Sequence, residues 1–176
     1  MFNENDVQVG DLLFYEAKDL LGHLIGFFSD IFHPFKINIS HVSGISKIVD
    51  GKVYIIEAHL SSGVIEKELN PKWYPVIQHK RLKCGLSQIQ KSELITYIRK
   101  NILGHKYDAI SFPSKFIRIF FWSKETPLLN SESEYDCAET WSVAYKNSLN
   151  IDLTPRINMR TVNPQQLSNS TRLTTV

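Results

Sequence analysis

The fold is decided by residues 40–59, whose sequence is SHVSGISKIVDGKVYIIEAH. Two runs rich in β-branched residues, His41–Val49 and Val53–His59, flank the dipeptide Asp50-Gly51. An Asp-Gly pair between two such runs favours a tight two-residue turn. The stretch therefore predicts a β-hairpin that carries two histidines and one glutamate.

Further elements are predicted on both sides of this hairpin. Turn residues separate the expected strands. Residues Val9 to Tyr15 predict a turn that leads into a short buried strand, and two further strands are expected at Gly63–Leu69 and Val76–Leu82. Apolar residues at helical spacing predict helices over Leu20–Ile31, over Ser87–Leu103 with a capping box of Ser87 and Gln90, and from about Asp136 to Leu149. Strands in one block followed by helices in another predict the α+β class.

Length and composition limit the organisation and the partners. The 176 residues are expected to form one domain, 1–176, with a core at about 9–149 and a polar C-terminal extension at 150–176. Twenty basic against eighteen acidic residues give a net charge of +2, which does not favour nucleic acid as a partner. Two cysteines exclude a disulfide framework, and no histidine pair has metal-ligand spacing, so we expect no metal and no cofactor. The N-terminus lacks the pattern of a secretory signal, which favours a cytoplasmic location.

Cys137 is the most informative single residue. It lies where a turn enters the predicted helix, and backbone dipoles at a helix start favour the thiolate, which is the nucleophilic form. The alternative is a small buried core residue, and Asp136 beside it is expected to cap the helix. Cys84, with basic neighbours, is a rival nucleophile that we expect to be structural.

A thiol nucleophile needs a base, and His41 is the best candidate among six histidines. It begins a strand with small neighbours, whereas His79 is expected to point outward from its own strand. Glu57 is expected to orient the imidazole, because a carboxylate in an apolar strand needs a partner. His59, which faces the same side of the strand, is the competing orienting residue. Alternatively, Glu57 pairs with a surface lysine such as Lys47 or Lys52.

Five motifs occur in order along the chain: Gly10-Asp11-Leu12-Leu13-Phe14, Ser40-His41-Val42-Ser43-Gly44-Ile45, Ile56-Glu57-Ala58, Gly104-His105-Lys106-Tyr107-Asp108 and Tyr135-Asp136-Cys137-Ala138-Glu139. Together they resemble the circularly permuted papain-like hydrolases of the YiiX/YaeF group, relatives of the NlpC-type cell-wall peptidases and of lecithin:retinol acyltransferase. The resemblance covers about Val9 to Leu149. It implies an antiparallel sheet or small barrel packed against helices, with the nucleophile at a helix N-terminus.

The resemblance also implies roles for individual residues. Cys137 would be the nucleophile, His41 the general base and acid, and Glu57 the orienting residue. Tyr107 resembles the tyrosine that helps to stabilise the oxyanion in NlpC-type enzymes, with Tyr135 and the Cys137 backbone N–H as rival donors. The neighbouring side chains of Ser40, Tyr135 and His59 are expected to contact the substrate. One departure is Cys-Ala-Glu, where relatives more often have Cys-Ser-Glu.

Three functions remain open at this point. The first is a thiol amidase or peptidase that acts on a cell-wall peptide or a related small peptide. The second is a lipid ester or amide hydrolase, or an acyltransferase, in peripheral contact with a membrane through the apolar segments Leu20–Phe35 and Ile110–Trp122. The third is a non-catalytic ligand-binding module.

Overall fold

The computed structural model describes residues 2–16, 39–59, 61–70, 75–107, 134–155, 157–160 and 162–176. The predicted helix Leu20–Ile31 and the aromatic segment Ile110–Trp122 lie outside these ranges.

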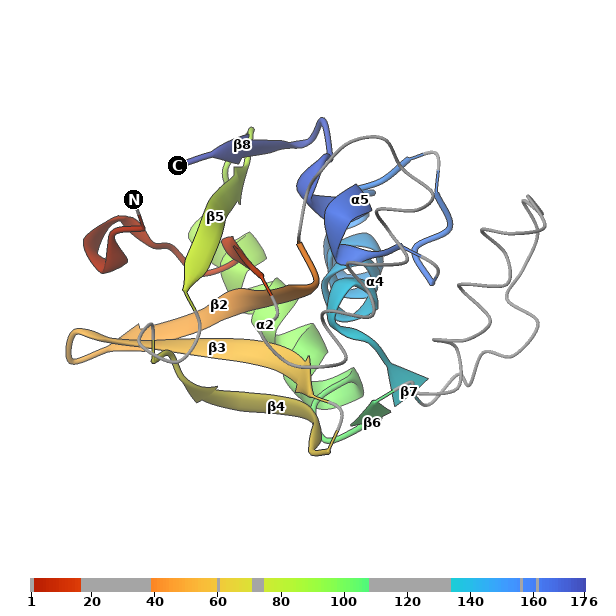
Figure 1. Cartoon of the computed structure of the whole chain (residues 1–176), viewed down its shortest axis with the longest axis horizontal. Helices are drawn as coiled ribbons and strands as arrows, with labels where there is room; N and C mark the ends of the chain where they lie inside the picture. Colours follow the sequence, from red (N-terminus) through yellow and green to blue (C-terminus); the bar gives the residue numbers. More distant parts are fainter. Residues whose placement is uncertain are drawn as a thin grey trace.

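An open six-stranded antiparallel sheet forms the centre of the fold (Figure 1), with strand order β4-β3-β2-β1-β5-β8. Its strands are β1 (Leu12–Tyr15), β2 (His41–Val49), β3 (Lys52–His59), β4 (Gly63–Glu68), β5 (Val76–Leu82) and β8 (Leu173–Thr175). The β2–β3 hairpin turns at Asp50-Gly51, where both residues have positive φ, as that turn requires. The predicted strands are thus confirmed to within a residue or two.

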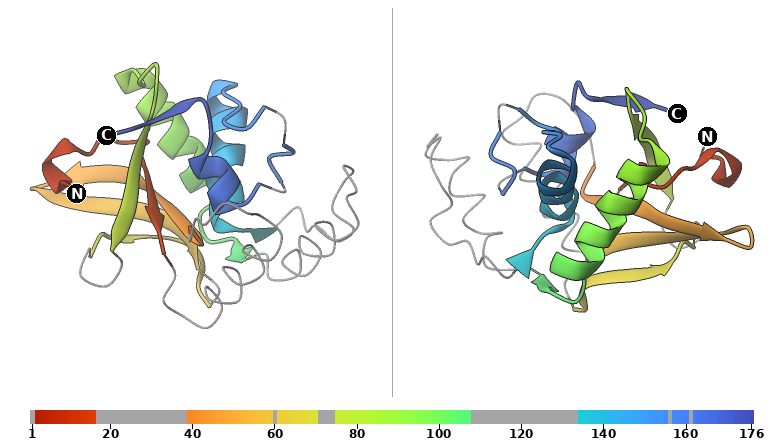
Figure 2. Two further views of the ribbon diagram at one scale, coloured as in Figure 1. Left: turned by 45° about the horizontal axis from the view of Figure 1, so that its top comes forward. Right: turned by 180° about the vertical axis from the view of Figure 1, so that it is seen from behind.

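Within the described ranges, the sheet is accompanied by the helices α2 (Gln88–Asn101), α4 (Cys137–Leu149) and α5 (Pro164–Ser168), besides a 3-10 turn at Glu4–Asp6. The capping box of Ser87 and Gln90 begins α2 as predicted. Seen from behind, α2 lies across the sheet, and α4 lies beside α2 (Figure 2). None of the helices that the structure describes has the length and apolar character needed to cross a bilayer.

The two faces of the sheet bury different clusters because strand side chains alternate. Leu12 and Phe14 of β1 join the main core with α2 and α4. Leu13 and Tyr15 of the same strand belong to a smaller cluster with residues of β2 and β3. The α+β class is therefore built on a sheet with apolar residues on both faces.

One glycine determines how closely α4 approaches the sheet. A Cβ at Gly44 of β2 would lie 2.3 Å from the ring of Trp141, so only glycine leaves room for this side chain. The indole fills the space and donates from Nε1 to the carbonyl of Ile56 on β3 at 3.2 Å. Because Trp141 lies one helical turn after Cys137, this contact fixes the start of α4 against β2 and β3.

The C-terminal extension has more structure than its polar composition suggests. In it, α5 packs against α4 and β8 pairs with β5. Val162 and Leu167 are completely buried, and Leu173 is nearly so. Few apolar residues are present, but each of these three faces the core. The predicted polar extension therefore also contributes these three residues to the core.

Candidate active site

Cys137 begins α4, and only 4% of its surface is exposed. Asp136 caps the helix as expected, because its carboxylate accepts a hydrogen bond from the backbone N–H of Glu139 at 2.7 Å. The first turn of a helix presents unpaired N–H groups and the positive end of the dipole. The backbone around Cys137 is therefore suited to an anion.

His41 and Cys137 are brought together, although they lie far apart in the sequence. His41 begins β2, which lies beside the N-terminal part of α4 (Figure 1). The Cys137 sulfur lies close enough to the imidazole to raise the pKa of His41. The ring of Tyr15, from β1, packs against the imidazole at a centroid distance of 5.7 Å. The Tyr15 hydroxyl forms a hydrogen bond with the Ser43 hydroxyl at 2.6 Å. Strands β1 and β2 and helix α4 thus hold the imidazole from several sides.

The environment of His41 strongly favours its protonated form. Burial alone would lower the pKa of the imidazole, because the cation loses solvation. The nearby Cys137 sulfur and the interactions with Glu57 outweigh burial and raise the pKa of His41 to about 10. Since 21% of the His41 side chain is exposed, protons can exchange with solvent.

Glu57, on β3, contacts the other side of the imidazole. Its Oε2 lies 2.9 Å from Nε2 of His41, and only 2% of the Glu57 side chain is exposed. Burial alone would raise the pKa of Glu57, but its interactions with His41 and Lys67 lower that pKa to about 2. Glu57 is thus ionised at neutral pH and is the residue found in contact with His41.

Lys67 of β4 is a neighbour that the sequence analysis missed. Its Nζ lies 2.5 Å from Oε1 of Glu57. The two lysines that the sequence suggests as partners of Glu57 pair elsewhere, Lys47 with Glu66 and Lys52 with Glu68. A signal was available, because the turn at 61–63 sets the hairpin register that pairs Glu57 with Ile65. Lys67 lies two residues after Ile65 on β4, so its side chain faces the same side of the sheet as that of Glu57.

The other predicted substrate-binding residues have different surroundings. His59 is at the end of β3, and its Nδ1 makes a hydrogen bond with Ser61 in the adjoining turn at 3.0 Å. Ser40 directly precedes β2 and is buried, with its backbone N–H donating to the carbonyl of Tyr15 at 3.1 Å. Ser40 therefore directly precedes His41 in the sequence, whereas His59 contacts the β3–β4 turn.

Both predicted tyrosines lie on the approach to the helix. Tyr107 belongs to β6 (Lys106–Tyr107), and Tyr135 belongs to β7 (Glu134–Tyr135). These short strands run parallel, and Tyr107 pairs in register with Tyr135. Tyr135 is two residues before Cys137 in the sequence. The structure thus places the two tyrosines side by side next to the start of α4.

Arg160 is a second residue that the sequence analysis missed. Its guanidinium lies over the Tyr135 ring at 5.0 Å, and its Nη1 donates to Oε1 of Glu139 at 2.7 Å. Glu139 is completely buried in the first turn of α4. The loop from the C-terminal extension therefore supplies a cation to the start of the helix that carries Cys137. No local pattern around Arg160 signals this contact.

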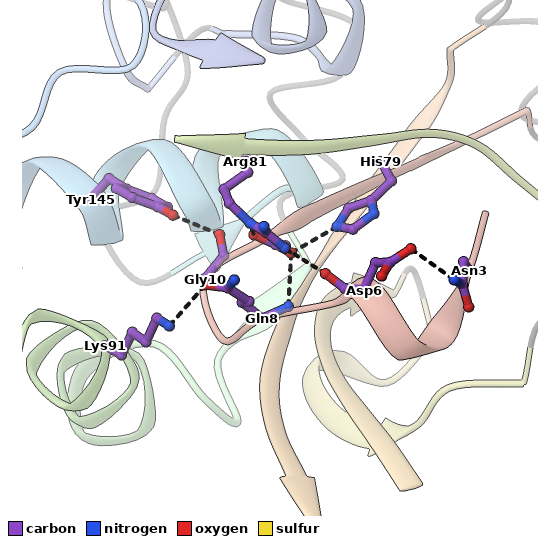
Figure 3. Close-up of polar contacts among 9 residues, drawn as sticks. Asn3, Asp6, Gln8, Gly10, His79, Arg81, Lys91 and Tyr145 are labelled. Atoms are coloured by element: carbon purple, nitrogen blue, oxygen red, sulfur yellow. Dashed lines mark hydrogen bonds and ion pairs between the residues drawn. The ribbon is translucent and has the colours of Figure 1, made fainter. Parts of the chain in front are cut away.

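A second polar cluster lies between the N-terminal segment, β1 and β5 (Figure 3). Asp11 receives hydrogen bonds from His79 at 2.7 Å and from two nitrogens of Arg81, each at 2.8 Å. His79 is buried, so the expectation that it points outward was wrong. In the same region, Tyr145 of α4 donates to the carbonyl of Gly10 at 2.6 Å. These contacts attach both β5 and α4 to the beginning of β1.

Comparisons with known proteins identify the fold. No family model matches the chain, and no curated protein matches it. Among solved structures, the chain is similar to the metalloprotein YiiX from Escherichia coli O157:H7, with a TM-score of 0.66, 21% sequence identity and 96% of each chain covered. The resemblance to the YiiX/YaeF group is thereby confirmed at the level of the fold, and this chain has the YiiX fold.

Proposed function

We propose that the protein is a thiol hydrolase that cleaves an amide bond through an acyl-enzyme on Cys137, in a permuted papain-like arrangement. The observation that carries the proposal is the grouping of Cys137, His41 and Glu57 at the start of α4, where His41 is in contact with Glu57 and its pKa is raised by the nearby Cys137 sulfur. A thiol, an imidazole and an orienting acid in contact are the groups required for nucleophilic acyl transfer.

The reaction follows from the charges in the site. The Cys137 sulfur, as thiolate, attacks the carbonyl carbon of the amide, and the carbonyl oxygen becomes an oxyanion. The His41 imidazolium gives its proton to the leaving nitrogen as the C–N bond breaks, which leaves a thioester on Cys137. Neutral His41 then takes a proton from water, whose oxygen attacks the thioester. Collapse of this second intermediate releases the carboxylic acid and restores the thiolate and imidazolium.

Glu57 and the start of α4 support these steps. Because Nε2 of His41 is engaged by Glu57, Nδ1 is the nitrogen left to exchange protons with the sulfur and the leaving group. The backbone N–H of Cys137, at the start of a helix, is suited to donate to the oxyanion. Tyr107 and Tyr135 are the side chains proposed to add a second donor.

The proposed substrate class is a cell-wall peptide or a related small peptide, which the resemblance to NlpC-type peptidases suggests. YiiX is described as a metalloprotein, so the donor set of this chain bears on the mechanism. Within the residues that the structure describes, no three His, Cys, Asp or Glu side chains are grouped to hold a metal. Both Glu57 oxygens already contact cationic partners, His41 and Lys67. The described residues therefore do not fit a metal site, and no proposed step passes through one.

The test combines trapping with a matched cysteine control. The protein is incubated with a panel of peptidoglycan fragments and acyl lipids, and its intact mass is measured over time. We expect a peptide-derived acyl adduct that is absent in Cys137→Ala and retained in Cys84→Ala, since Cys84 is an exposed residue in the turn that follows β5. An adduct from acyl lipids alone would redirect the substrate to lipids. Equal turnover in folded Cys137→Ala and wild-type protein would refute the thiol mechanism.

A further inference from the structure

Charged side chains from three neighbouring strands form a continuous series that ends at Cys137. Lys67 on β4 contacts Oε1 of Glu57 on β3, and Oε2 of the same carboxylate contacts His41 on β2. The Cys137 sulfur on α4 is in turn close enough to His41 to raise the pKa of the imidazole. Since β4, β3 and β2 are adjacent in the sheet, the register of two hairpins alone brings the three charged groups together.

The two oxygens of Glu57 have different partners, and this matters for a buried carboxylate. Lys67 keeps about a third of its side chain exposed, so its ammonium reaches the buried Glu57 from the rim of the sheet. Without Lys67, Oε1 would lose its cation and the full carboxylate charge would act on His41. The carboxylate could also turn about its side-chain bonds, because one of its two anchors would be gone.

We propose that Lys67 is a positioning residue for His41: its ammonium anchors Glu57 and takes up part of the carboxylate charge, so that the imidazolium can release its proton to a leaving group. The role as stated rests on the proposed function. It adds a fourth member, Lys67, to the site formed by Glu57, His41 and Cys137.

The sign of the effect follows from the charges that face His41. From α4 comes Cys137, from β3 comes Glu57, and from β1 comes the uncharged ring of Tyr15. Among the described residues, both charged neighbours favour the cation. Lys67 stabilises the Glu57 carboxylate, and as a cation behind that carboxylate it opposes protonation of His41. Removing the ammonium should therefore make His41 hold its proton more tightly.

The direct test is the titration of His41 by NMR of its ring nitrogens. It is performed in Cys137→Ala protein, in which the sulfur no longer raises the pKa of the imidazole and the midpoint falls in a convenient range. We expect Lys67→Met to move the midpoint upward by about 1 pH unit, because the cation on the other side of Glu57 from the imidazole is lost. Lys67→Arg should leave it nearly unchanged.

The matched control is Lys52→Met, which removes a lysine from the same pair of strands. The partner of Lys52 is the exposed Glu68, not Glu57. Its His41 midpoint should equal that of the parent. Lys67→Gln serves as a second neutral variant if methionine disturbs β4. An unchanged or lowered midpoint in the neutral Lys67 variants would overturn the proposal.

Turnover provides the second measurement once a substrate is found. At neutral pH, Lys67→Met should lower kcat about threefold with KM unchanged, since a more basic imidazolium is a poorer acid toward the leaving group, and Lys67→Arg should restore it. A loss that appears in KM alone would contradict a role through His41. The NMR titration of His41 needs no substrate. Failure to find turnover in wild-type protein would therefore count against the proposed hydrolase activity, while the effect of Lys67 on His41 could still be measured.

Discussion

Glu57 and His41 fix each other's charge, and this coupling predicts the effect of neutralising the acid. Glu57→Gln replaces the carboxylate that stabilises the imidazolium with an amide of the same shape. The pKa of His41 should therefore fall from about 10 by about 1–2 units, the opposite direction to that expected for Lys67→Met. The alkaline limit of amide hydrolysis should move down by the same amount, and NMR titration of His41 checks the change directly.

Glu68→Gln is the control for this prediction, because it removes a carboxylate that lies on β4 and pairs with the exposed Lys52. The control should titrate as wild-type protein does. If His41 in folded Glu57→Gln keeps its wild-type midpoint, the carboxylate does not hold the imidazolium and its assigned role is wrong.

The buried ion pair between Glu139 and Arg160 predicts a cost in stability rather than a change in titration. Arg160→Met would leave a completely buried carboxylate without this cation, which typically costs about 3 kcal/mol of the unfolding free energy. Denaturant unfolding measures the loss. Adding Glu139→Gln should recover a substantial part of it, whereas the exposed Arg172→Met should change little. A double variant no more stable than Arg160→Met would mean that the loss has another origin.

Among the elements, the contact between β2 and α4 controls whether the site forms. Gly44→Ala would bring a methyl group to within 2.3 Å of the Trp141 ring, so α4 must move outward or the indole must leave its place. Overpacking of this kind costs about 1–3 kcal/mol. Because Cys137 lies one turn before Trp141, its position relative to His41 should change, and iodoacetamide should modify Cys137 at a different rate.

A suitable comparison is Gly51→Ala, at the tip of the β2–β3 hairpin. An added Cβ there meets no atom within 4 Å, although the positive φ of Gly51 makes it strained. It should lose stability without changing the reaction of Cys137. Identical alkylation of wild-type protein and folded Gly44→Ala would show that the distance between α4 and the sheet does not control the site.

Local signals explain which elements could be predicted from the sequence. The hairpins of β2, β3 and β4 are marked by Asp50-Gly51 and by the turn at 61–63, so strand boundaries and the facing of Glu57 follow from short-range rules. The start of α4 could be predicted for the same reason, because Asp136 is a strong cap.

Contacts that depend on distant chain segments could not be predicted in this way. Nothing near Arg160 indicates that Glu139 needs a cation, and nothing near Gly44 indicates that Trp141 will occupy its space. Alternation along the strand predicts that His79 points outward, but Asp11, far away in the sequence, provides a buried partner. Each miss concerns a side chain whose partner comes from another part of the fold.

At the scale of the whole molecule, the site and the end of the chain lie in different parts of one sheet. Glu57 and His41 belong to β3 and β2, whereas β8 is the opposite edge strand, separated from β2 by β1 and β5. Backbone hydrogen bonds attach this edge, from Lys83 to Arg172 and from Val176 to His79. The C-terminal strand should therefore contribute to global stability without shaping the site.

Leu173→Ala tests this separation, because Leu173 is the buried residue of β8 and joins the main core. Truncating a buried leucine costs about 2–4 kcal/mol, since apolar burial is lost and a cavity remains. Thermal or denaturant unfolding should show that loss, while Thr174→Ala, at an exposed position of the same strand, should show almost none. Under conditions where Leu173→Ala remains folded, the His41 titration and the alkylation of Cys137 should equal those of wild-type protein. A shift in either would mean that strain at the β8 edge reaches β2 through β5 and β1, and that the sheet behaves as one mechanical unit.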